Sequence, residues 1–403
     1  MAPVLERLPD GPICVAVSGG GDSIALLVLL AAWAGPERLT AITVDHRLRP
    51  GFAAEAEAAA RAAAALSVPH HVLDWSGWDG QGNLQDAARR ARRDLLTQAA
   101  RAAGAATVAL GHTADDQAET LLMRLARGSG VYGLEAMAPV STRGGLIRAR
   151  PILGIDREPL RVFLRGRGIA WAEDPSNADP AFERVRMRET LPMLAKLGLT
   201  VPRLAGTAAA LARAGDVVRA EVERLARRAA RPHPAGWVAL DRAAFDDALP
   251  ELRLRLLAET LRWVAAADYT PRLEALEALA GHLRTETGNH TLHGCLIRAE
   301  ARAIHVFREP ARCGPPVPAG AVWDRRWDTG ADRPGLTVSA LGPELSRVPT
   351  PVDAALRRAL SSTPAFRDAD GALIAAPFAM PVKGCHAALW TGTEGYFSRL
   401  TLR

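Results

Sequence analysis

The chain has 403 residues, of which 48% are hydrophobic and 23% charged, as in a soluble globular protein with room for two or three domains. No apolar run is long enough to span a membrane, no signal-peptide core is present, and the four cysteines form no Cys-x-x-Cys pair, which excludes a membrane protein, a zinc ribbon and a disulfide scaffold. The formal net charge of +6 favours a polyanionic partner, and the protein is expected in the cytoplasm.

The first half of the chain alternates strand-like apolar runs with helix-like segments. Strands are predicted at residues 13–18, 39–45, 70–73, 107–111 and 146–149, and helices at residues 24–33, 53–66, 84–103 and 114–126. This order predicts an α/β fold in which a Rossmann-like, mostly parallel sheet is covered by helices on both faces. Ligands bind such sheets at the carboxyl ends of the strands, and the polar motifs of this half lie at those ends.

The second half changes character at about residue 191, where amphipathic helical spacing begins and continues to residue 283. The sequence also predicts a strand at 237–240, short strands over 289–307, a Pro/Gly-rich linker at 309–320 and a helix near 352–360. Three domains are therefore expected: a catalytic α/β domain over 1–195, a mostly helical middle domain over 196–310 and a small α+β domain over 321–403.

A glycine-rich turn, Ser18-Gly19-Gly20-Gly21-Asp22-Ser23, links the first strand to the first helix. Glycines let the backbone approach an anion, and the open N–H groups in the first turn of a helix point at it. The hydroxyls of Ser18 and Ser23 can donate to phosphate oxygens, and the carboxylate of Asp22 can hold a magnesium ion against them. A Walker A loop would need a lysine, and a dinucleotide fingerprint would need spaced glycines, so the turn predicts another kind of phosphate site.

A second polar segment, Gly111-His112-Thr113-Ala114-Asp115-Asp116-Gln117-Ala118-Glu119-Thr120, follows the fourth predicted strand. Thr113 can cap the helix and acidic residues suit its first turn, so a well-capped helix with a solvated start is one interpretation. The other interpretation notes that Asp115 and Glu119 are four residues apart, as are Asp116 and Thr120, so adjacent faces carry acid. Beside a phosphate loop these carboxylates could ligate magnesium or hold an ammonium group, and the segment alone leaves both interpretations open.

Together the two segments resemble the motifs Ser-Gly-Gly-x-Asp-Ser and Gly-His-x-x-Asp-Asp-Gln-x-Glu-Thr of the tRNA(Ile)-lysidine synthetase family, in the ATP pyrophosphatase (PP-loop) superfamily. Segments similar to further family motifs lie in the expected order, at residues 44–49, 83–92, 127–137, 150–153 and 173–177. The resemblance covers roughly residues 12–192. It departs from the family in Arg184-Val185-Arg186-Met187-Arg188, where a valine stands in place of the usual asparagine.

The resemblance implies a ligation in two steps. The oxygen on carbon 2 of the wobble cytidine of tRNA(Ile), which has a CAU anticodon, attacks the α phosphorus of ATP and releases pyrophosphate. The ε-amine of free lysine then attacks carbon 2 and expels AMP, giving lysidine and changing codon recognition from AUG to AUA. The implied cofactors are ATP and Mg²⁺, and the implied partners are tRNA(Ile) and free L-lysine, with no membrane and with a homodimer among the oligomeric states left open.

The resemblance also implies roles for individual residues. ATP is expected to bind at Ser18, Gly19, Gly20, Gly21, Asp22, Ser23, Asp45 and Arg89, and Mg²⁺ at Asp22 and Asp115. The catalytic residues are expected to be Asp22, Arg92, His112 and Asp116. The ammonium of lysine is expected at Asp116 and Glu119, its carboxylate at Arg184 or Arg188, and tRNA at Arg127, Gly128 and Arg150.

For His112, and for a group of arginines in the second half of the chain, a functional role and a simpler alternative both remain open. His112 could take the proton of the lysine amine, or it could be a hydrogen-bonded histidine at the end of a strand. Arginines on the later helices could contact tRNA phosphates or could cover a solvated helix face, namely Arg224, Arg227, Arg228 and Arg231.

Three other functions share parts of the pattern. A tRNA-thiolating enzyme of the same superfamily would usually need paired cysteines, which the chain lacks. A catalytically silent, nucleotide-responsive RNA-binding module would not need the carboxylates of Asp22, Asp115, Asp116 and Glu119. An enzyme that amidates or ligates a small metabolite would leave the arginine-rich second half unexplained.

Overall fold

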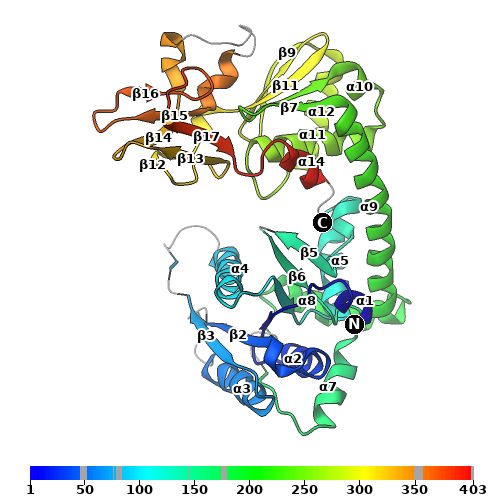
Figure 1. Cartoon of the computed structure of the whole chain (residues 1–403). Helices are drawn as coiled ribbons and strands as arrows, with labels where there is room; N and C mark the ends of the chain where they lie inside the picture. Colours follow the sequence, from blue (N-terminus) through cyan, green and yellow to red (C-terminus); the bar gives the residue numbers. More distant parts are fainter. Residues whose placement is uncertain are drawn as a thin grey trace. The chain divides into compact units, whose positions relative to one another are not determined.

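The computed structural model describes residues 1–45, 52–75, 77–78, 84–143, 145–173, 179–348 and 357–400 (Figure 1). The chain divides into two compact units, residues 1–215 and 216–402. Within the described residues, no helix has both the length and the apolar character of a membrane span.

The first unit is built on a six-stranded sheet in the order β3-β2-β1-β4-β6-β5. Five strands are parallel: β1 (Ile13–Ala16), β2 (Leu39–Asp45), β3 (His70–Asp74), β4 (Thr107–Leu110) and β6 (Leu146–Ala149). The edge strand β5 (Val140–Arg143) is antiparallel to β6. The predicted parallel sheet is confirmed, and β5 is an addition that the sequence pattern does not predict.

Helices cover both faces of this sheet, as predicted (Figure 1). On one face, α2 (Gly21–Ala34), α3 (Phe52–Ala65) and α7 (Arg157–Arg165) bury apolar side chains against β1 and β2. On the other face, α4 (Leu84–Ala102) does the same. A separate small core joins α5 (Ala114–Ala126), α8 (Glu183–Lys196) and the start of α9 (Val201–Ala229).

The shorter elements of this unit are α1 (Ala2–Leu5), the 3-10 turn η1 (Pro36–Arg38) and α6 (Val131–Leu134). The predicted first strand ran two residues too far and the predicted first helix began three residues too late, because β1 ends at Ala16 and α2 begins at Gly21. The chain leaves the sheet early so that the glycine turn itself supplies the first turn of the helix. That shift places the backbone N–H groups of the turn at a helix N-terminus.

The second unit contains a five-stranded antiparallel sheet in the order β7-β8-β11-β10-β9. Its strands are β7 (Ala230–Pro232), β8 (Val238–Asp241), β9 (Gly288–Leu292), β10 (Cys295–Ala299) and β11 (Ala303–Arg308). Helices α10 (Arg242–Asp247), α11 (Pro250–Val264) and α12 (Leu273–Thr285) lie between β8 and β9 in the chain. The strands predicted near 237–240 and 289–307 correspond to β8 and to β9 through β11.

The last part of the chain is rich in strands. A four-stranded sheet contains β12 (Val317–Pro318), β14 (Thr337–Ala340), β15 (Pro364–Arg367) and β16 (Leu373–Ala375), and a two-stranded sheet pairs β13 (Trp327–Ala331) with β17 (Cys385–Leu389). The 3-10 turns η3 (Pro310–Arg312), η4 (Gly342–Arg347) and η5 (Arg358–Ser362) and helix α14 (Glu394–Leu400) complete it.

Two predictions for this part need comment. The predicted linker at 309–320 is not a free connection, because η3 lies in it and β12 pairs with β14. Of the helix predicted near 352–360, residues 352–356 lie outside the described residues, and Arg358–Ser362 form a 3-10 turn. Helix α14 packs into the core formed by α11, α12 and the five-stranded sheet, where the hydroxyls of Tyr396 and Thr260 lie 2.8 Å apart.

Candidate active site at the carboxyl edge of the parallel sheet

The glycine turn between β1 and α2 is held in shape by its own serines. The backbone N–H of Ser18 donates to Oγ of Ser23 at 3.1 Å, and that hydroxyl donates to the carbonyl oxygen of Gly20 at 2.9 Å. The two hydroxyls lie 3.2 Å apart. Because Gly20, the residue before α2, has no side chain to cap the helix, the N–H groups of the first turn stay available to an anion.

Close backbone approach explains two of the glycines at this site. Gly19 has φ +83°, and a Cβ there would lie 2.2 Å from the carbonyl oxygen of Glu55 in α3. A Cβ on Gly111, which follows β4, would lie 2.9 Å from Cα of Ser23. The backbone N–H of Ala172 also donates to the carbonyl oxygen of Gly19 at 2.9 Å. The turn is therefore fixed by three separate segments of the chain.

The acidic start of α5 is at once a capping box and part of a charged cluster. Oδ2 of Asp116 accepts from the backbone N–H of Thr113 at 2.8 Å and from its hydroxyl at 3.0 Å. Oδ1 of the same carboxylate faces Nη2 of Arg157 at 3.4 Å. The predicted cap is confirmed, but the predicted solvated start is wrong, because Asp116 and Glu119 are buried. One oxygen of Asp116 belongs to the cap and the other faces the charged cluster.

Arg157, the first residue of α7, is the centre of the cluster and was not predicted from the sequence. Its Nε donates to Oδ2 of Asp22 at 2.9 Å, and its Nη1 lies 3.7 Å from Oε1 of Glu119 and 4.0 Å from Oδ1 of Asp115. Burial disfavours the charge on Arg157, but the carboxylates of Asp116 and Asp22 outweigh it and raise the pKa of the guanidinium. We call Asp22, Asp115, Asp116 and Glu119 the acidic cradle.

Individual carboxylates of the cradle respond differently to their surroundings. Burial raises the pKa of Asp22, against the opposing charge of Arg157. Burial also favours protonation of Asp116, yet the charge of Arg157 and the N–H of Thr113 hold its pKa below the usual range. Asp116 is therefore an anion at neutral pH and can attract a cation.

Glu119 lies at the bottom of the cradle with no exposed side-chain surface. Its Oε1 accepts from Nε of Arg188 at 2.9 Å, and Nε of Arg184 lies 3.5 Å from Oε2, outside good hydrogen-bond geometry. Among the described residues, nothing donates a hydrogen bond to Oε2. A buried carboxylate oxygen without a donor is costly, which suits a site that receives one from a ligand.

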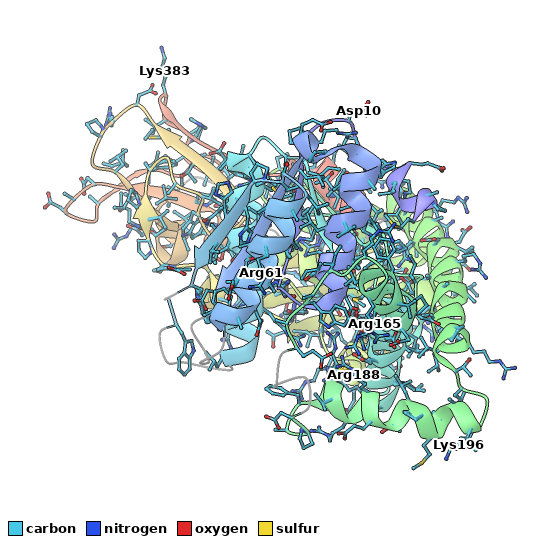
Figure 2. All side chains as sticks on the ribbon, turned by 90° about the horizontal axis from the view of Figure 1, so that it is seen from below. Asp10, Arg61, Arg165, Arg188, Lys196 and Lys383 are labelled. Carbon is cyan, nitrogen blue, oxygen red and sulfur yellow. The ribbon has the colours of Figure 1, made fainter. Side chains whose placement is uncertain are left out.

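Arg184 and Arg188 lie on α8, one helical turn apart, and both reach Glu119. Figure 2 shows Arg188 among the side chains of the first unit, whereas Lys196, the last residue of α8, lies at the periphery. Val185, the departure from the family motif, is buried at 6% exposure on the same helix. The valine is thus buried, and both arginines near it on α8 contact Glu119.

His112 is held by a neighbour in a way that limits its chemistry. Nε of Arg150 donates to Nδ1 of His112 at 3.2 Å, and Nη1 of Arg150 donates to the carbonyl oxygen of Ala138 at 2.8 Å. Burial and then the charge of Arg150 lower the pKa of His112 to about 4. A neutral imidazole that accepts at Nδ1 carries its proton on Nε2, so this geometry favours a hydrogen-bonded histidine over a proton acceptor.

An asparagine in place of His112 tests this assignment, because it can accept from Arg150 without titrating. The pKa of His112 is about 4 in the folded chain against 6.5 ordinarily, so the unfolded chain binds more protons between these values and stability rises with pH, by roughly 3 kcal/mol. We expect wild type to gain this amount over His112→Asn from pH 4 to 6.5 and nothing above, measured as the free energy of unfolding in urea. A pH-independent difference would contradict the assignment.

The predicted tRNA residues do not all lie together. Arg127 and Gly128 follow the C-terminal end of α5, where Arg127 pairs with Glu183, whereas Arg150 lies beside His112 before the start of that helix. A helix of 13 residues separates the two ends by about 20 Å. Asp45 ends β2, at the same sheet edge as the glycine turn, and Arg89 and Arg92 lie exposed on α4.

Parts of the predicted pattern lie outside the described residues, namely 46–49, 83 and 174–177. Within the parts of the chain that are described, no group of three or more His, Cys, Asp or Glu could hold a metal ion. Asp22 and Asp115, the predicted Mg²⁺ ligands, do converge on the same guanidinium of Arg157. Two carboxylates suit Mg²⁺ when substrate phosphates and waters supply its other ligands.

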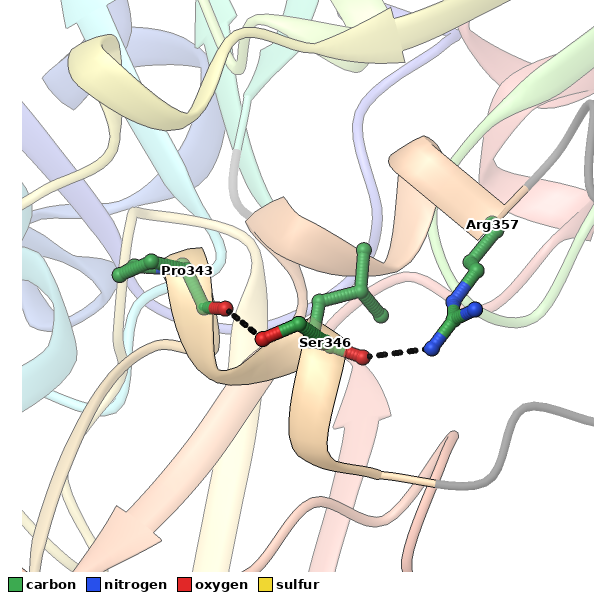
Figure 3. A pocket seen from close by; sticks show the side chains of 5 residues that line it. Pro343, Ser346 and Arg357 are labelled. Carbon is green, nitrogen blue, oxygen red and sulfur yellow. Dashed lines mark hydrogen bonds between the residues drawn. The ribbon is translucent and has the colours of Figure 1, made fainter.

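A pocket of about 400 Å³ lies in the second unit, between η4 and η5 (Figure 3). It is lined by Gly342, Pro343, Leu345, Ser346 and Arg357. The hydroxyl of Ser346 donates to the carbonyl oxygen of Pro343, and Arg357 donates to that of Leu345. Among the described residues, its lining holds one charged side chain and none of the paired groups that the cradle offers for catalysis.

A glycine turn at a helix N-terminus, on the carboxyl edge of a parallel sheet, is typical of a nucleotide-binding α/β domain. The PP-loop domain family matches residues 2–194. The tRNA(Ile)-lysidine synthase of Ruegeria pomeroyi is 43% identical over 97% of this chain and 94% of its own length. That of Bradyrhizobium diazoefficiens is 45% identical over 78% of this chain and 86% of its own. The chain belongs to the tRNA(Ile)-lysidine synthase family.

Solved structures resemble the chain at greater distance. The U34-tRNA thiolase NcsA from Methanococcus maripaludis is 17% identical, with a TM-score of 0.42 over 52% of this chain and 73% of that chain.

Proposed function

We propose that this chain joins free lysine to carbon 2 of the wobble cytidine in tRNA(Ile) with a CAU anticodon, consuming ATP and releasing AMP and pyrophosphate. The observation that carries the proposal is the coexistence, at one sheet edge, of the PP-loop turn and the acidic cradle in a chain that matches its relatives over nearly their whole length. Lysidine in that position changes codon reading from AUG to AUA.

In the first step the protein orients ATP and the cytidine for attack on the α phosphorus. The first-turn N–H groups of α2 bind the pyrophosphate part of ATP, and the hydroxyls of Ser18 and Ser23 turn to it from their bonds within the glycine turn. These donors stabilise the negative charge that develops on pyrophosphate as it leaves. Arg92, helped by Arg89, neutralises the α phosphate. Mg²⁺ would be held by Asp22 and Asp115 and would offset the charge of the phosphate oxygens.

In the second step the cradle receives lysine. Asp116 and the donor-poor Oε2 of Glu119 bind its ammonium group, and Arg184 or Arg188 binds its carboxylate. His112 keeps its neutral form and donates from Nε2, so the proton of the lysine amine passes to solvent water. Release of AMP completes the ligation.

The middle domain, over 196–310, and the C-terminal domain, over 321–403, bind tRNA. The arginines of α9 and β7, in the middle domain, contribute to this binding. Arg224 pairs with Glu221 and Arg227 with Glu223, which offsets part of their charge. Arg228 and Arg231 are exposed beside them and are the better candidates for phosphate contacts. A homodimer is the oligomeric state to test, by sedimentation with and without tRNA.

Thiolation is disfavoured by the state of the cysteines. Burial raises the pKa of the Cys295 and Cys313 thiols to about 12, and it also raises the pKa of Cys14 and Cys385. Sulfur transfer needs a thiolate, which such groups do not supply at neutral pH.

The proposal is tested by incorporation of radiolabelled lysine into an unmodified tRNA(Ile) transcript bearing CAU, with ATP and magnesium. A transcript with uridine at the wobble position is the matched control. We expect label in the first transcript only, with one AMP per lysine. Cleavage of ATP to AMP and pyrophosphate without label would overturn the lysine assignment and move the acceptor elsewhere.

A further inference from the structure

Arg157 occupies the centre of the cradle that the proposed function assigns to substrates. Its guanidinium faces carboxylates from two helices, Asp22 on α2 and the acidic group on α5, while Arg157 itself begins α7. These elements come from segments far apart in the sequence, since Asp22 and Arg157 are 135 residues apart. One side chain thus connects the phosphate loop to the residues proposed for lysine.

We infer that Arg157 is a positioning residue: it is the internal counter-ion of the acidic cradle, and the lysine ammonium takes its place at Asp116 and Glu119. The inference rests on the proposed function for the identity of the incoming cation. In the free chain the guanidinium of Arg157 faces Asp22, Asp116 and Glu119 together and offsets part of their charge. When lysine binds, the guanidinium of Arg157 keeps its contact with Asp22 and gives up its contacts with Asp116 and Glu119.

The contact distances support an exchange of this kind. The contact of Arg157 with Asp22 is a good hydrogen bond at 2.9 Å, whereas those with Asp116 and Glu119 are long, at 3.4 and 3.7 Å. An ammonium group is a compact charge with three donors and can approach both acceptors more closely than the wide guanidinium does. It can also supply the donor that Oε2 of Glu119 lacks among the described residues.

The backbone around Arg157 stays in place while its side chain can adjust. The N–H of Arg157 donates to Oδ2 of Asp115 at 2.8 Å, and the N–H of Ala114 donates to the carbonyl oxygen of Ile155 at 3.0 Å. These bonds tie the start of α7 to the start of α5. The side chain is 14% exposed, so it can be reached from solvent.

Charge also limits how many cations the cradle accepts. Among the described residues, the four carboxylates of the cradle face the guanidinium groups of Arg157, Arg184 and Arg188, so each guanidinium removed makes this cluster one charge more negative. Without Arg157 the cradle would attract cations more strongly, but its carboxylate side chains would be less well oriented. Removing this one charge should therefore tighten lysine binding and slow the reaction, a combination that a merely structural role does not produce.

The test uses Arg157→Gln and Arg157→Lys in the full chain, with Arg61→Gln as the matched control. Arg61 is exposed on α3 (Figure 2), and the residue that it pairs with is Glu57, which is not part of the cradle. Binding of labelled lysine is measured by equilibrium dialysis without ATP and tRNA, and kcat and KM for lysine are measured with both. We expect Arg157→Gln to bind lysine about tenfold tighter, with a lower KM and a kcat lowered about tenfold or more.

Arg157→Lys keeps the charge but cannot span Asp22 and Glu119 together, so we expect lysine binding tightened by about threefold and a partly restored kcat. This variant decides the matter if Arg157→Gln does not fold. Unchanged or weaker lysine binding in the folded variants, with Arg61→Gln equal to wild type, would overturn the inference. Failure of the wild-type chain itself to bind or incorporate lysine would instead overturn the proposed function.

Discussion

Asp116→Asn is expected to lose at least about 100-fold in kcat/KM for lysine, because it removes one charge from a buried, hydrogen-bonded cluster. Asparagine can still accept from Thr113 and cap α5, so the fold of the helix start should survive. What it loses is the anion that faces Arg157 and that we assign to the lysine ammonium.

The two steps of the reaction separate this role from a general loss of activity. Release of pyrophosphate that depends on tRNA should change little in Asp116→Asn, whereas incorporation of labelled lysine should fall and its KM should rise. Asp10→Asn, an exposed site in the first unit, is the matched control and should behave as wild type (Figure 2). Equal losses in both steps would show that Asp116 serves the phosphate side of the site rather than lysine.

The parts of the site that the sequence predicts are those whose structure is local. The glycine turn and the capped start of α5 each depend on neighbours within a few residues, as in the bond of Ser18 to Ser23 or of Thr113 to Asp116. The strands β2 and β6 and the helix α5 have the predicted bounds, because their apolar periodicity is clear and the residues at their ends are strong signals for the start or end of an element. Such features can be read without knowing the tertiary fold.

Arg157 shows why the rest escapes prediction. Its partners lie 135 and 41 residues earlier, and one arginine in an arginine-rich chain has no local signal. The sequence after the fifth predicted strand does contain signals for a helix start. Asp156 is a good residue to precede a helix, and the acidic Glu158 and then Pro159 are both favoured in a first turn. Those signals would have placed Arg157 at the same sheet edge as the two motifs, though not its contacts.

The edge strand β5 and the hydrogen bond between Arg150 and His112 were missed for a related reason. Val140–Arg143 has mixed polarity and is a strand because it pairs with β6, not because of its own periodicity. The pairing of Arg150 with His112 joins the end of β6 to the end of β4, and this contact adds to burial in lowering the basicity of the histidine. Side-chain roles that depend on contacts between different strands can be assigned only from the folded structure.

Gly19→Ala should abolish ATP binding and destabilise the first unit by about 2–4 kcal/mol, as expected when a side chain is forced into a strained and occupied position. With φ at +83° alanine is strained, and its Cβ would lie 2.2 Å from the carbonyl oxygen of Glu55, which is backbone and cannot rotate away. Either α3 or the turn must shift, and a shifted turn no longer directs its N–H groups at one phosphate.

Binding of a non-hydrolysable ATP analogue by calorimetry and thermal unfolding measure the two effects. Gly154→Ala is the matched control, because among the described residues, its chain neighbours apart, no atom lies within 4 Å of the position that its Cβ would take, and its φ is not in the left-handed region. Gly20→Ala gives a comparison inside the turn and should leave stability nearly unchanged, since in the described part of the chain its Cβ would meet Oγ of Ser18 alone, at 3.6 Å. If Gly19→Ala bound the analogue as wild type does, the close approach of the turn to α3 would not be what shapes the phosphate site.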